Sequence, residues 1–231
     1  MPKAEKVTET LTVYQQPGVF SYGTDAVLLV KYVESTVVGL NGKNMCDLCS
    51  GTGIIPLMLC DEFKGLRASM LEINGDAAKL SALSAEQSNL SDRVDVYNGD
   101  VKNVRSIFGG ESFDFVTCNP PYMRTDSGKM CEDDYKTIAR HEVLCSISDV
   151  FAAAFYLLRT GGCAYIVYRT DRLSALMAAA RENKFEVKHI CFFRSRENST
   201  QSELCVIKAM KNAAEGMKAD VYTVGEFLGR K

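Results

Sequence analysis

Short apolar runs alternate with longer segments of helical character through the middle of the chain. The short runs have the length and apolar content of buried strands, and the longer segments carry apolar side chains at helical spacing. The pattern predicts strands at 43–49, 67–73, 93–100, 112–119 and 163–169, and helices at 53–63, 75–90, 147–162 and 172–184. Such alternation is typical of an α/β fold with a mostly parallel sheet and helices on both faces.

Local signals set some of the expected boundaries. Ser148 or Asp149 is expected to cap the helix at 147–162, and the glycine pair 161–162 is expected to stop it. A further helix is expected from about Thr24. Segments 185–196 and 202–210 are two strand-like runs with only a short polar break, which predicts an antiparallel hairpin at the end of the sheet.

The length of 231 residues favours one domain. We expect an N-terminal extension with a helix at 1–40, a core at 41–211 and a tail at 212–231, with disorder only in the first ten or so residues. No apolar run reaches the ~18–20 residues that span a bilayer, and the charged N-terminus lacks the apolar stretch of a secretory signal.

Nine scattered cysteines suit buried thiols in a reducing compartment better than a disulfide framework, which favours the cytoplasm. Cys46 and Cys49 form one C-x-x-C, but no second pair or nearby histidine completes a zinc site. We therefore expect no metal, and two cysteines on one face of a strand.

Charge is unevenly distributed around a formal net charge of −2. Residues 1–150 carry 14 Lys and Arg against 21 Asp and Glu, whereas residues 151–231 carry 13 against 8. A basic C-terminal third could lie along a phosphate backbone. On charge alone, a solvated surface of mixed charge is the simpler interpretation.

A glycine-containing turn, "DLCSGTGII" (47–55), follows the first strand of the core and begins the first helix there. Glu72 ends the next strand, where an acid can accept both hydroxyls of a ribose. Pro56 stands where a nicotinamide cofactor normally needs a third glycine for its pyrophosphate, which leaves adenosine with a short tail that carries no phosphate. Asp100, after the third strand, can accept from an adenine amino group.

These residues resemble the motifs of class I S-adenosylmethionine-dependent methyltransferases, which have a Rossmann-like fold with a seven-stranded sheet. The resemblance covers roughly residues 20–210 and implies S-adenosyl-L-methionine as cofactor. Cys49 departs from the family pattern, because it occupies the first slot where the family often has a glycine. The implied cofactor-binding residues in this region are Asp47, Cys49, Gly51, Gly53, Glu72, Ile73, Asp100 and Val101.

The octet "TCNPPYMR" (117–124) ends the fourth strand and resembles the NPPY motif of amino-methyltransferases. A ring-conjugated amino nitrogen becomes a better nucleophile when two acceptors face its hydrogens. The Asn119 side-chain oxygen and the Pro120 carbonyl would be those acceptors, with Asn119 also beside the cofactor, and Tyr122 would stack on the flat substrate. The bland alternative is a strand that ends in a proline-rich turn.

The flanks are similar to the bacterial tRNA(Val) adenine-N6 methyltransferase family, on "FSYGTDAVLL", "ARHE" (139–142) and "VYTVGEF" (221–227). That resemblance implies a tRNA substrate, and Tyr22, Thr24 and Asp25 covering the methionine end of the cofactor. An amphipathic helix that packs on the sheet would explain the same segment. The segment 123–136 has the length and polarity of a substrate flap. Candidate RNA contacts are Arg124, Lys129, Arg140, Arg169, Arg172, Arg194 and Arg196.

Other members of the NPPY group remain alternatives. A protein-glutamine methyltransferase usually carries an N-terminal helical domain, and a guanine-N2 rRNA enzyme usually has Phe in place of Tyr122. A DNA adenine methyltransferase would need a target-recognition domain. A module that only binds an adenosyl group would not need the paired acceptors. We expect no membrane association and no obligatory protein partner.

Overall fold

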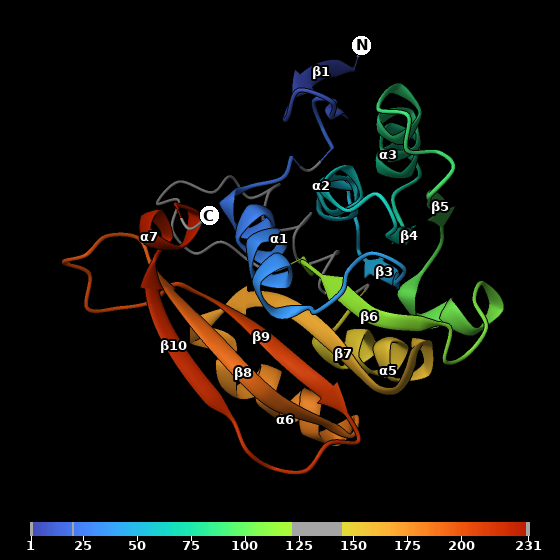
Figure 1. Ribbon diagram of the computed structural model, residues 1–231. Coiled ribbons are helices and arrows are strands. Elements are labelled where there is room, and N and C mark those ends of the chain that lie inside the picture. The colour runs from blue at the N-terminus through green and yellow to red at the C-terminus, as the bar shows by residue number, and fades with distance from the viewer. Residues whose placement is uncertain (1, 20, 122–144, 230–231) are drawn as a thin grey trace.

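The computed structural model describes residues 2–19, 21–121 and 145–229. Its centre is an eight-stranded sheet with the order β10-β8-β9-β7-β6-β3-β4-β5 (Figure 1). The strands are β3 (Asn44–Leu48), β4 (Arg67–Glu72), β5 (Val94–Asn98), β6 (Phe113–Cys118), β7 (Leu158–Arg169), β8 (Phe185–Arg194), β9 (Leu204–Lys211) and β10 (Lys218–Thr223). All neighbours pair in parallel except β9, which is antiparallel to β7 and β8. The expected mostly parallel sheet with a hairpin is confirmed.

Helices cover both faces of the sheet, as the sequence predicts. In Figure 1, α1 and α2 lie in front of the strands, and α5 and α6 lie behind them. The helices are α1 (Thr24–Thr36), α2 (Ile54–Glu62), α3 (Gly75–Gln87), α5 (Ile147–Leu157), α6 (Leu173–Glu182) and α7 (Val224–Leu228), with 3-10 turns η1 (Val101–Ser106) and η2 (Thr170–Arg172). None of these described helices is long and apolar enough to cross a bilayer.

The core has two halves, one on each face of the sheet. Successive residues of a strand point to opposite faces, so Met45 of β3 packs with α1 and α2 while Cys46 packs with α5. In β7, Tyr165 and Val167 face the first half and Ile166 faces the second. Burial on both faces explains why these central strands read as continuous apolar runs.

The helix expected at 147–162 begins at Ile147 as predicted, but its expected cap and its expected end are wrong. Its N-cap is Ser146, whose hydroxyl accepts from the Asp149 N–H while the Asp149 carboxylate accepts in return. The helix ends at Leu157, and the glycine pair lies inside β7. The reason is that Leu158 is buried and extended and pairs with Phe113 of β6, so strand pairing begins before the glycines are reached.

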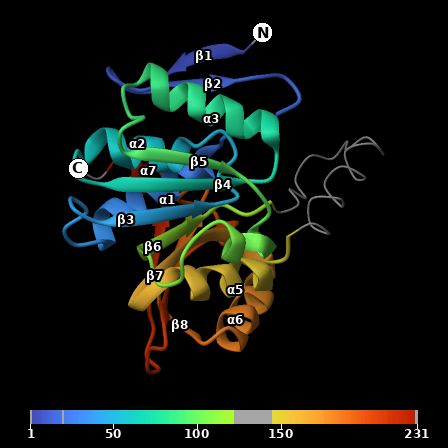
Figure 2. The ribbon, with the colours of Figure 1, turned by 90° about the vertical axis from the view of Figure 1, so that its right-hand side faces the viewer.

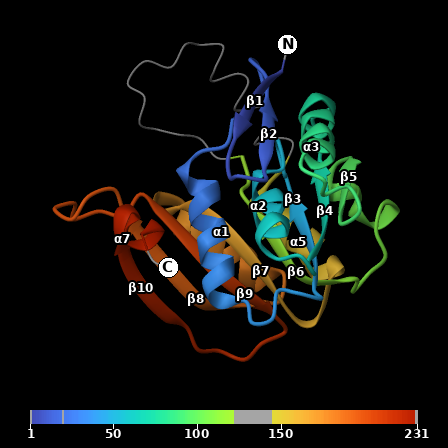
Figure 3. The ribbon, with the colours of Figure 1, turned by 45° about the horizontal axis from the view of Figure 1, so that its top comes forward.

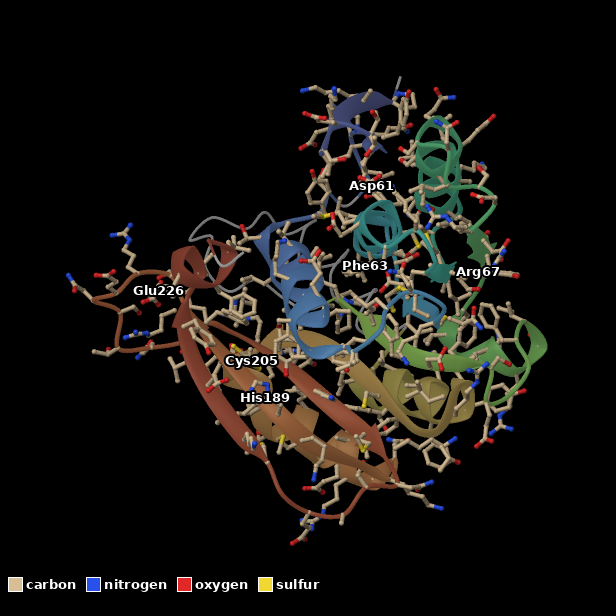
Figure 4. All side chains as sticks on the ribbon, in the orientation of Figure 1. Asp61, Phe63, Arg67, His189, Cys205 and Glu226 are labelled. Atoms are coloured by element: carbon tan, nitrogen blue, oxygen red, sulfur yellow. The ribbon has the colours of Figure 1, made fainter. Side chains whose placement is uncertain are left out.

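The expected disorder of the first ten residues is also wrong. β1 (Lys3–Lys6) pairs antiparallel with β2 (Thr12–Gln15), and the hairpin lies beside α3 (Figure 2). The Thr12 and Tyr14 N–H groups donate to hydroxyls on α3, at 3.0 and 2.9 Å. Asp61, at the end of α2, accepts from the hydroxyls of Thr8 and Thr10 at 2.7 Å each (Figure 4). Strands of four residues are too short to give a clear sequence pattern.

The segment expected to be a tail contains β10 and α7, so the sheet has eight strands and not seven. β10 pairs in parallel with β8 at the edge of the sheet. The Phe227 ring of α7 packs on Phe193 with their centroids 4.9 Å apart. Most side chains of β10 are exposed, which explains why its apolar signal was too weak to predict a strand.

Candidate active site

The sequence-predicted residues meet at one edge of the sheet, beyond the carboxyl ends of β3, β4, β5 and β6. The Thr117 hydroxyl of β6 donates to Asp47 Oδ1 of β3 at 2.5 Å. Glu72 Oε2 at the end of β4 accepts from the Gly51 N–H at 2.7 Å, and the Glu72 carbonyl accepts from the Gly99 N–H at 2.9 Å. Ligands of open α/β sheets bind at this edge.

The turn after β3 carries three residues with positive φ: Cys49 at 55°, Gly51 at 56° and Gly53 at 80°. A side chain at Gly53 would meet the Met70 sulfur at 2.7 Å, so this glycine is required by packing. Gly51 has open space around the place of a Cβ. The backbone at Gly51 is therefore open to a ligand.

Glu72 has a second role that the sequence did not reveal. It is 8% exposed, and its two carboxylate oxygens accept backbone N–H groups from Gly51 and Asn74, the latter at 2.8 Å. The carboxylate thus ties the glycine turn to β4. Each oxygen keeps a further lone pair for a ribose hydroxyl. Only the three-dimensional fold brings the Gly51 N–H to Glu72, which is why the sequence alone did not show it.

Two buried polar atoms in the turn region have no hydrogen-bond partner in the part of the chain that the structure describes. They are Asp47 Oδ2 and Ser50 Oγ. Burial raises the pKa of Asp47 to about 8, the Thr117 hydrogen bond lowers it, and the Glu72 charge raises it. Buried polar groups are normally paired. An ammonium, a hydroxyl or a bridging water of a bound ligand would satisfy such atoms, so this donor and acceptor set fits the polar tail of the predicted cofactor.

The strand end beyond β5 offers polar and apolar surface side by side. Asp100 is half-buried, and its Oδ1 accepts from the Lys102 N–H at 2.9 Å as the cap of η1. Ile73 is 43% exposed, unlike the buried Val101. Ile73 follows β4 and Asp100 follows β5, so the ends of two paired strands offer an exposed aliphatic side chain and a carboxylate, which suits a flat heterocycle with an amino edge.

Asn119 directly follows β6 and is half-buried, and Pro120 is buried. The main chain of β6 is held next to β3 along the register that ends at Leu48 and Cys118. This pairing places Asn119 at the same edge as the glycine turn. Tyr122 and the candidate contacts Arg124, Lys129 and Arg140 lie outside the described residues, as does the segment 123–136.

The three candidate residues before and at the start of α1 differ in their contacts and in their exposure. The Tyr22 hydroxyl donates to Glu5 of the hairpin at 2.8 Å, and burial followed by this contact raises the pKa of Tyr22 to about 12. Asp25 is buried, and its Oδ1 accepts from the Ala26 N–H at 3.0 Å. Thr24 is exposed. Of the three, only Thr24 presents an exposed side chain.

The four described candidate RNA contacts lie at the same edge as Asn119, because β7 and β8 run in the direction of β6. Arg169 is buried and donates to Asp171 at 3.3 Å, and Arg172 precedes α6 as its N-cap. Arg194 donates to the carbonyls of residues 197 and 199, which holds the β8–β9 connection. Arg196 is exposed.

The C-x-x-C pair does not share a strand face. Cys46 is buried in β3, whereas Cys49 lies beyond the strand with its thiol 3.9 Å from that of Cys145. The residues that the structure describes contain no cluster of three or more His, Cys, Asp or Glu side chains arranged to hold a metal.

This chain is similar in sequence to proteins of known family. A family model described as "methyltransferase small domain" matches residues 10–188. A tRNA1(Val) (adenine(37)-N6)-methyltransferase from Porphyromonas gingivalis is 32% identical over 156 residues, which are 67% of this chain and 60% of that protein. This chain therefore spans about 60% of the length of that relative. A protein of the same name from Flavobacterium psychrophilum is 26% identical over 92% of this chain and 88% of its own.

Other matches extend the range. A release factor glutamine methyltransferase from Clostridium acetobutylicum is 35% identical over 126 residues, which are 54% of this chain and 44% of that protein. The solved structure of a predicted O-methyltransferase from Agrobacterium tumefaciens superposes with a TM-score of 0.68 at 18% identity, covering 86% of each chain. At that identity the similarity concerns the fold alone, and it confirms the Rossmann-like architecture expected from the sequence.

Proposed function

Because this chain belongs to the methyltransferase small domain family, we propose that it is an S-adenosylmethionine-dependent N-methyltransferase that acts on the exocyclic N6 of an adenine in tRNA. The observation that carries the proposal is the position of Asn119. This amide follows β6 at the edge where the Gly51 turn and Glu72 meet. An amide acceptor beside a nucleoside site is what transfer to an amino nitrogen requires.

The cofactor would occupy the space above the glycine turn. Glu72 accepts the ribose hydroxyls, and Asp100 accepts from the adenine amino group. Ile73 offers its exposed side chain to the adenine ring, beside the buried Val101. Asp47 and Ser50, whose orphaned oxygens lie next to the turn, pair with the methionine end directly or through water. When bound, S-adenosylmethionine supplies an electrophilic methyl group on its sulfonium.

Asn119 and Pro120 prepare the nucleophile. The Asn119 side-chain oxygen and the Pro120 carbonyl accept hydrogen bonds from the two amino hydrogens. The nitrogen lone pair then leaves conjugation with the ring and points to the methyl group. The proton leaves after the nitrogen has become cationic, so no general base is needed. Positioning and preorganised acceptors supply the rate. A base in an anticodon loop must leave its stack to reach this edge.

Relatives favour tRNA over protein as substrate. A relative named for tRNA1(Val) adenine-37 aligns with 92% of this chain. The glutamine methyltransferase relative is 35% identical, against 26%, but aligns with only 54% of this chain. Its similarity makes a glutamine side-chain amide the second candidate, since that nitrogen is also conjugated and needs the same two acceptors.

The decisive experiment is incubation of the protein with labelled S-adenosylmethionine and total tRNA from a strain that lacks it. Nucleoside analysis should reveal labelled N6-methyladenosine, concentrated in valine tRNA. Label in a release factor supplied in the same assay, with none in RNA, would move the assignment to the glutamine enzyme. Label in neither would contradict the proposed function.

An Asn119→Ala variant tests the role of the amide. We expect methyl transfer to fall at least a hundredfold, because one of two acceptors for the amino group is lost, while calorimetry shows nearly unchanged cofactor affinity. Asn98→Ala is the matched control, because Asn98 donates to the Glu72 and Ile73 carbonyls and belongs to the cofactor side. That variant should lower the affinity for the cofactor and have little effect on turnover when the cofactor is saturating. Wild-type turnover in Asn119→Ala would sink the mechanism.

A further inference from the structure

Two cysteine thiols lie in contact beside the proposed cofactor turn. Cys49 Sγ and Cys145 Sγ are 3.9 Å apart, one on the turn after β3 and the other directly before the N-cap of α5. These two are half-buried, whereas the six other described cysteines are buried. Among the described thiols, the two that solvent can reach are therefore the two that touch each other.

The backbone at Cys49 makes its identity informative. Cys49 has a φ of 55°, in the left-handed region that glycine adopts without cost and other residues adopt only with strain. Gly51 and Gly53 in the same turn have comparable φ values. A cysteine at this position is unfavourable for the backbone, so a role for its thiol would explain why the position is not a glycine.

A covalent change at Cys49 would affect the proposed cofactor site through the backbone of the turn. Cys49 stands two residues after Asp47 and two before Gly51, whose N–H donates to Glu72 at 2.7 Å. Cys145 is fixed from the other side, because Ser146 and Asp149 cap α5 reciprocally. Moving the Cys49 sulfur toward Cys145 therefore strains the turn more than the capped helix.

We propose that Cys49 and Cys145 form a reversible disulfide with small-molecule disulfides of the glutathione type, and that this bond closes the cofactor site. The consequence for the cofactor rests on the proposed function, whereas formation of the bond does not. A disulfide holds its sulfurs about 2 Å closer than the thiols are here, so forming it pulls the Cys49 side chain, and through it the turn, toward Cys145. That movement pulls Gly51 away from Glu72 and distorts the cradle.

The reaction balances in two exchange steps. One protein thiolate attacks the small disulfide, forms a mixed disulfide and releases one glutathione thiolate. The second protein thiolate attacks the protein sulfur of the mixed disulfide, forms the Cys49–Cys145 bond and releases the second glutathione. The two protein thiols lose two electrons and two protons, and the small disulfide gains them.

The surroundings make this exchange slow at neutral pH. The hydrogen bond with Cys118 raises the pKa of Cys49, the hydrogen bond with Cys49 raises the pKa of Cys145, and burial raises both. Thiolate is the reactive form, so little is present at neutral pH. The rate of disulfide formation should therefore rise with pH, and the bond would respond to sustained oxidation and not to brief exposure.

The test uses the full chain, reduced or treated with glutathione disulfide. Peptide mapping by mass spectrometry without reduction should find Cys49 linked to Cys145. Calorimetry with S-adenosylhomocysteine should find at least tenfold weaker binding after oxidation, restored by reduction. Cys145→Ser, with Cys145→Ala as a second variant in case the first is misfolded, should bind the ligand normally. Protein of either variant whose mass shows no glutathione on Cys49 should keep its affinity in the oxidant. Cys163→Ser is the matched control, a buried thiol distant from the turn, and should still lose affinity.

Three results would overturn the inference: no Cys49–Cys145 peptide in the oxidised protein, linkage of Cys49 to Cys118 in its place, or equal affinity of the linked and reduced proteins. Loss of affinity in oxidised Cys145→Ser whose mass shows no glutathione on Cys49 would also refute it. If the reduced wild-type protein binds no S-adenosylhomocysteine, the proposed function fails, and the peptide map still decides whether the disulfide forms.

Discussion

At the residue scale, Asp47 shows how burial changes the chemistry of a single side chain. It lies at the centre of the sheet with one oxygen on Thr117 and the other without a described partner. Burial raises its pKa to about 8. An acid that sits unpaired in the core at neutral pH opposes folding unless it is protonated or a ligand reaches it.

The raised pKa predicts a pH dependence of stability. In the unfolded chain Asp47 releases its proton near pH 4, whereas the folded protein keeps it until about pH 8. The contribution of this group is therefore fully present below about pH 4, declines as pH rises through this window and is lost above about pH 8. In Asp47→Asn that decline should disappear, which makes the slope shallower by up to about 1.4 kcal/mol per pH unit.

Urea unfolding of both proteins at several pH values between 5 and 8 measures this slope. Asp95→Asn is the control, because Asp95 is exposed on β5 and should leave the slope as it is in the wild type. Parallel curves for Asp47→Asn and wild type would show that Asp47 does not titrate in this window.

At the scale of elements, α1 is fastened to the sheet through the middle of its length. The Tyr32 hydroxyl is 2.5 Å from His189 Nδ1 of β8, and His189 Nε2 is 3.1 Å from an Asp220 oxygen of β10. The rings of Tyr32 and His189 stack with their centroids 5.6 Å apart. Figure 3 shows α1 lying across the sheet between α2 and α7, and Figure 4 places His189 on the sheet below it. An imidazole N–H at Nε2 can donate to the Asp220 carboxylate while the Tyr32 hydroxyl meets Nδ1.

Tyr32→Phe should destabilise the protein by about 1–3 kcal/mol, because the half-buried His189 ring loses its hydrogen-bond partner at Nδ1. Chemical denaturation measures the loss. Tyr97→Phe serves as control, since Tyr97 lies at the surface, and its stability should stay within about 0.5 kcal/mol of wild type. If both variants are equally stable, the Tyr32–His189 contact contributes nothing to docking of α1.

Buried elements were predictable from the sequence, and elements held at the surface were not. Ala164 and Ile166 pack on one face of the sheet and Tyr165 packs on the other, so β7 is apolar throughout and could be predicted from the sequence. β10 and the β1–β2 hairpin owe their positions to backbone pairing and to hydroxyls on α3, which leave no such pattern. In the candidate site, acids at strand ends could be predicted. Their partners could not, because the Gly51–Glu72 and Cys49–Cys145 contacts depend on packing of distant segments.

At the scale of the whole molecule, the basic C-terminal third contributes to the same edge as the candidate site. Arg169 and Arg194 are engaged with their own loops, which leaves Arg196 as the exposed candidate arginine in the β8–β9 connection. Charge there can act on an RNA backbone without changing the methyl-transfer site. The RNA-binding surface that we propose therefore includes fewer arginines than the number of basic residues in the C-terminal third of the sequence suggests.

Arg196→Glu should lower tRNA affinity and flatten its salt dependence by about 0.7 or more in the slope of log K against log salt, for the loss of one phosphate contact. Binding titrations at several salt concentrations measure it. Arg181→Glu is the control: Arg181 is exposed on α6 at the opposite edge, paired with Glu215, and should leave the slope unchanged. An unaltered slope in Arg196→Glu would remove the β8–β9 connection from the RNA surface.

The Tyr32–His189–Asp220 contact also constrains when α1 can form its polar contacts with the sheet during biosynthesis. α1 leaves the ribosome early, yet its polar partners lie 157 residues later at His189 and further on at Asp220. At ordinary translation rates, about 10–40 s separate the emergence of Tyr32 from that of Asp220. During that interval the apolar side of α1, with Leu28, Leu29 and Val33, has no completed sheet to cover. The polar partners of α1 therefore become available only when β8 and then β10 have been made.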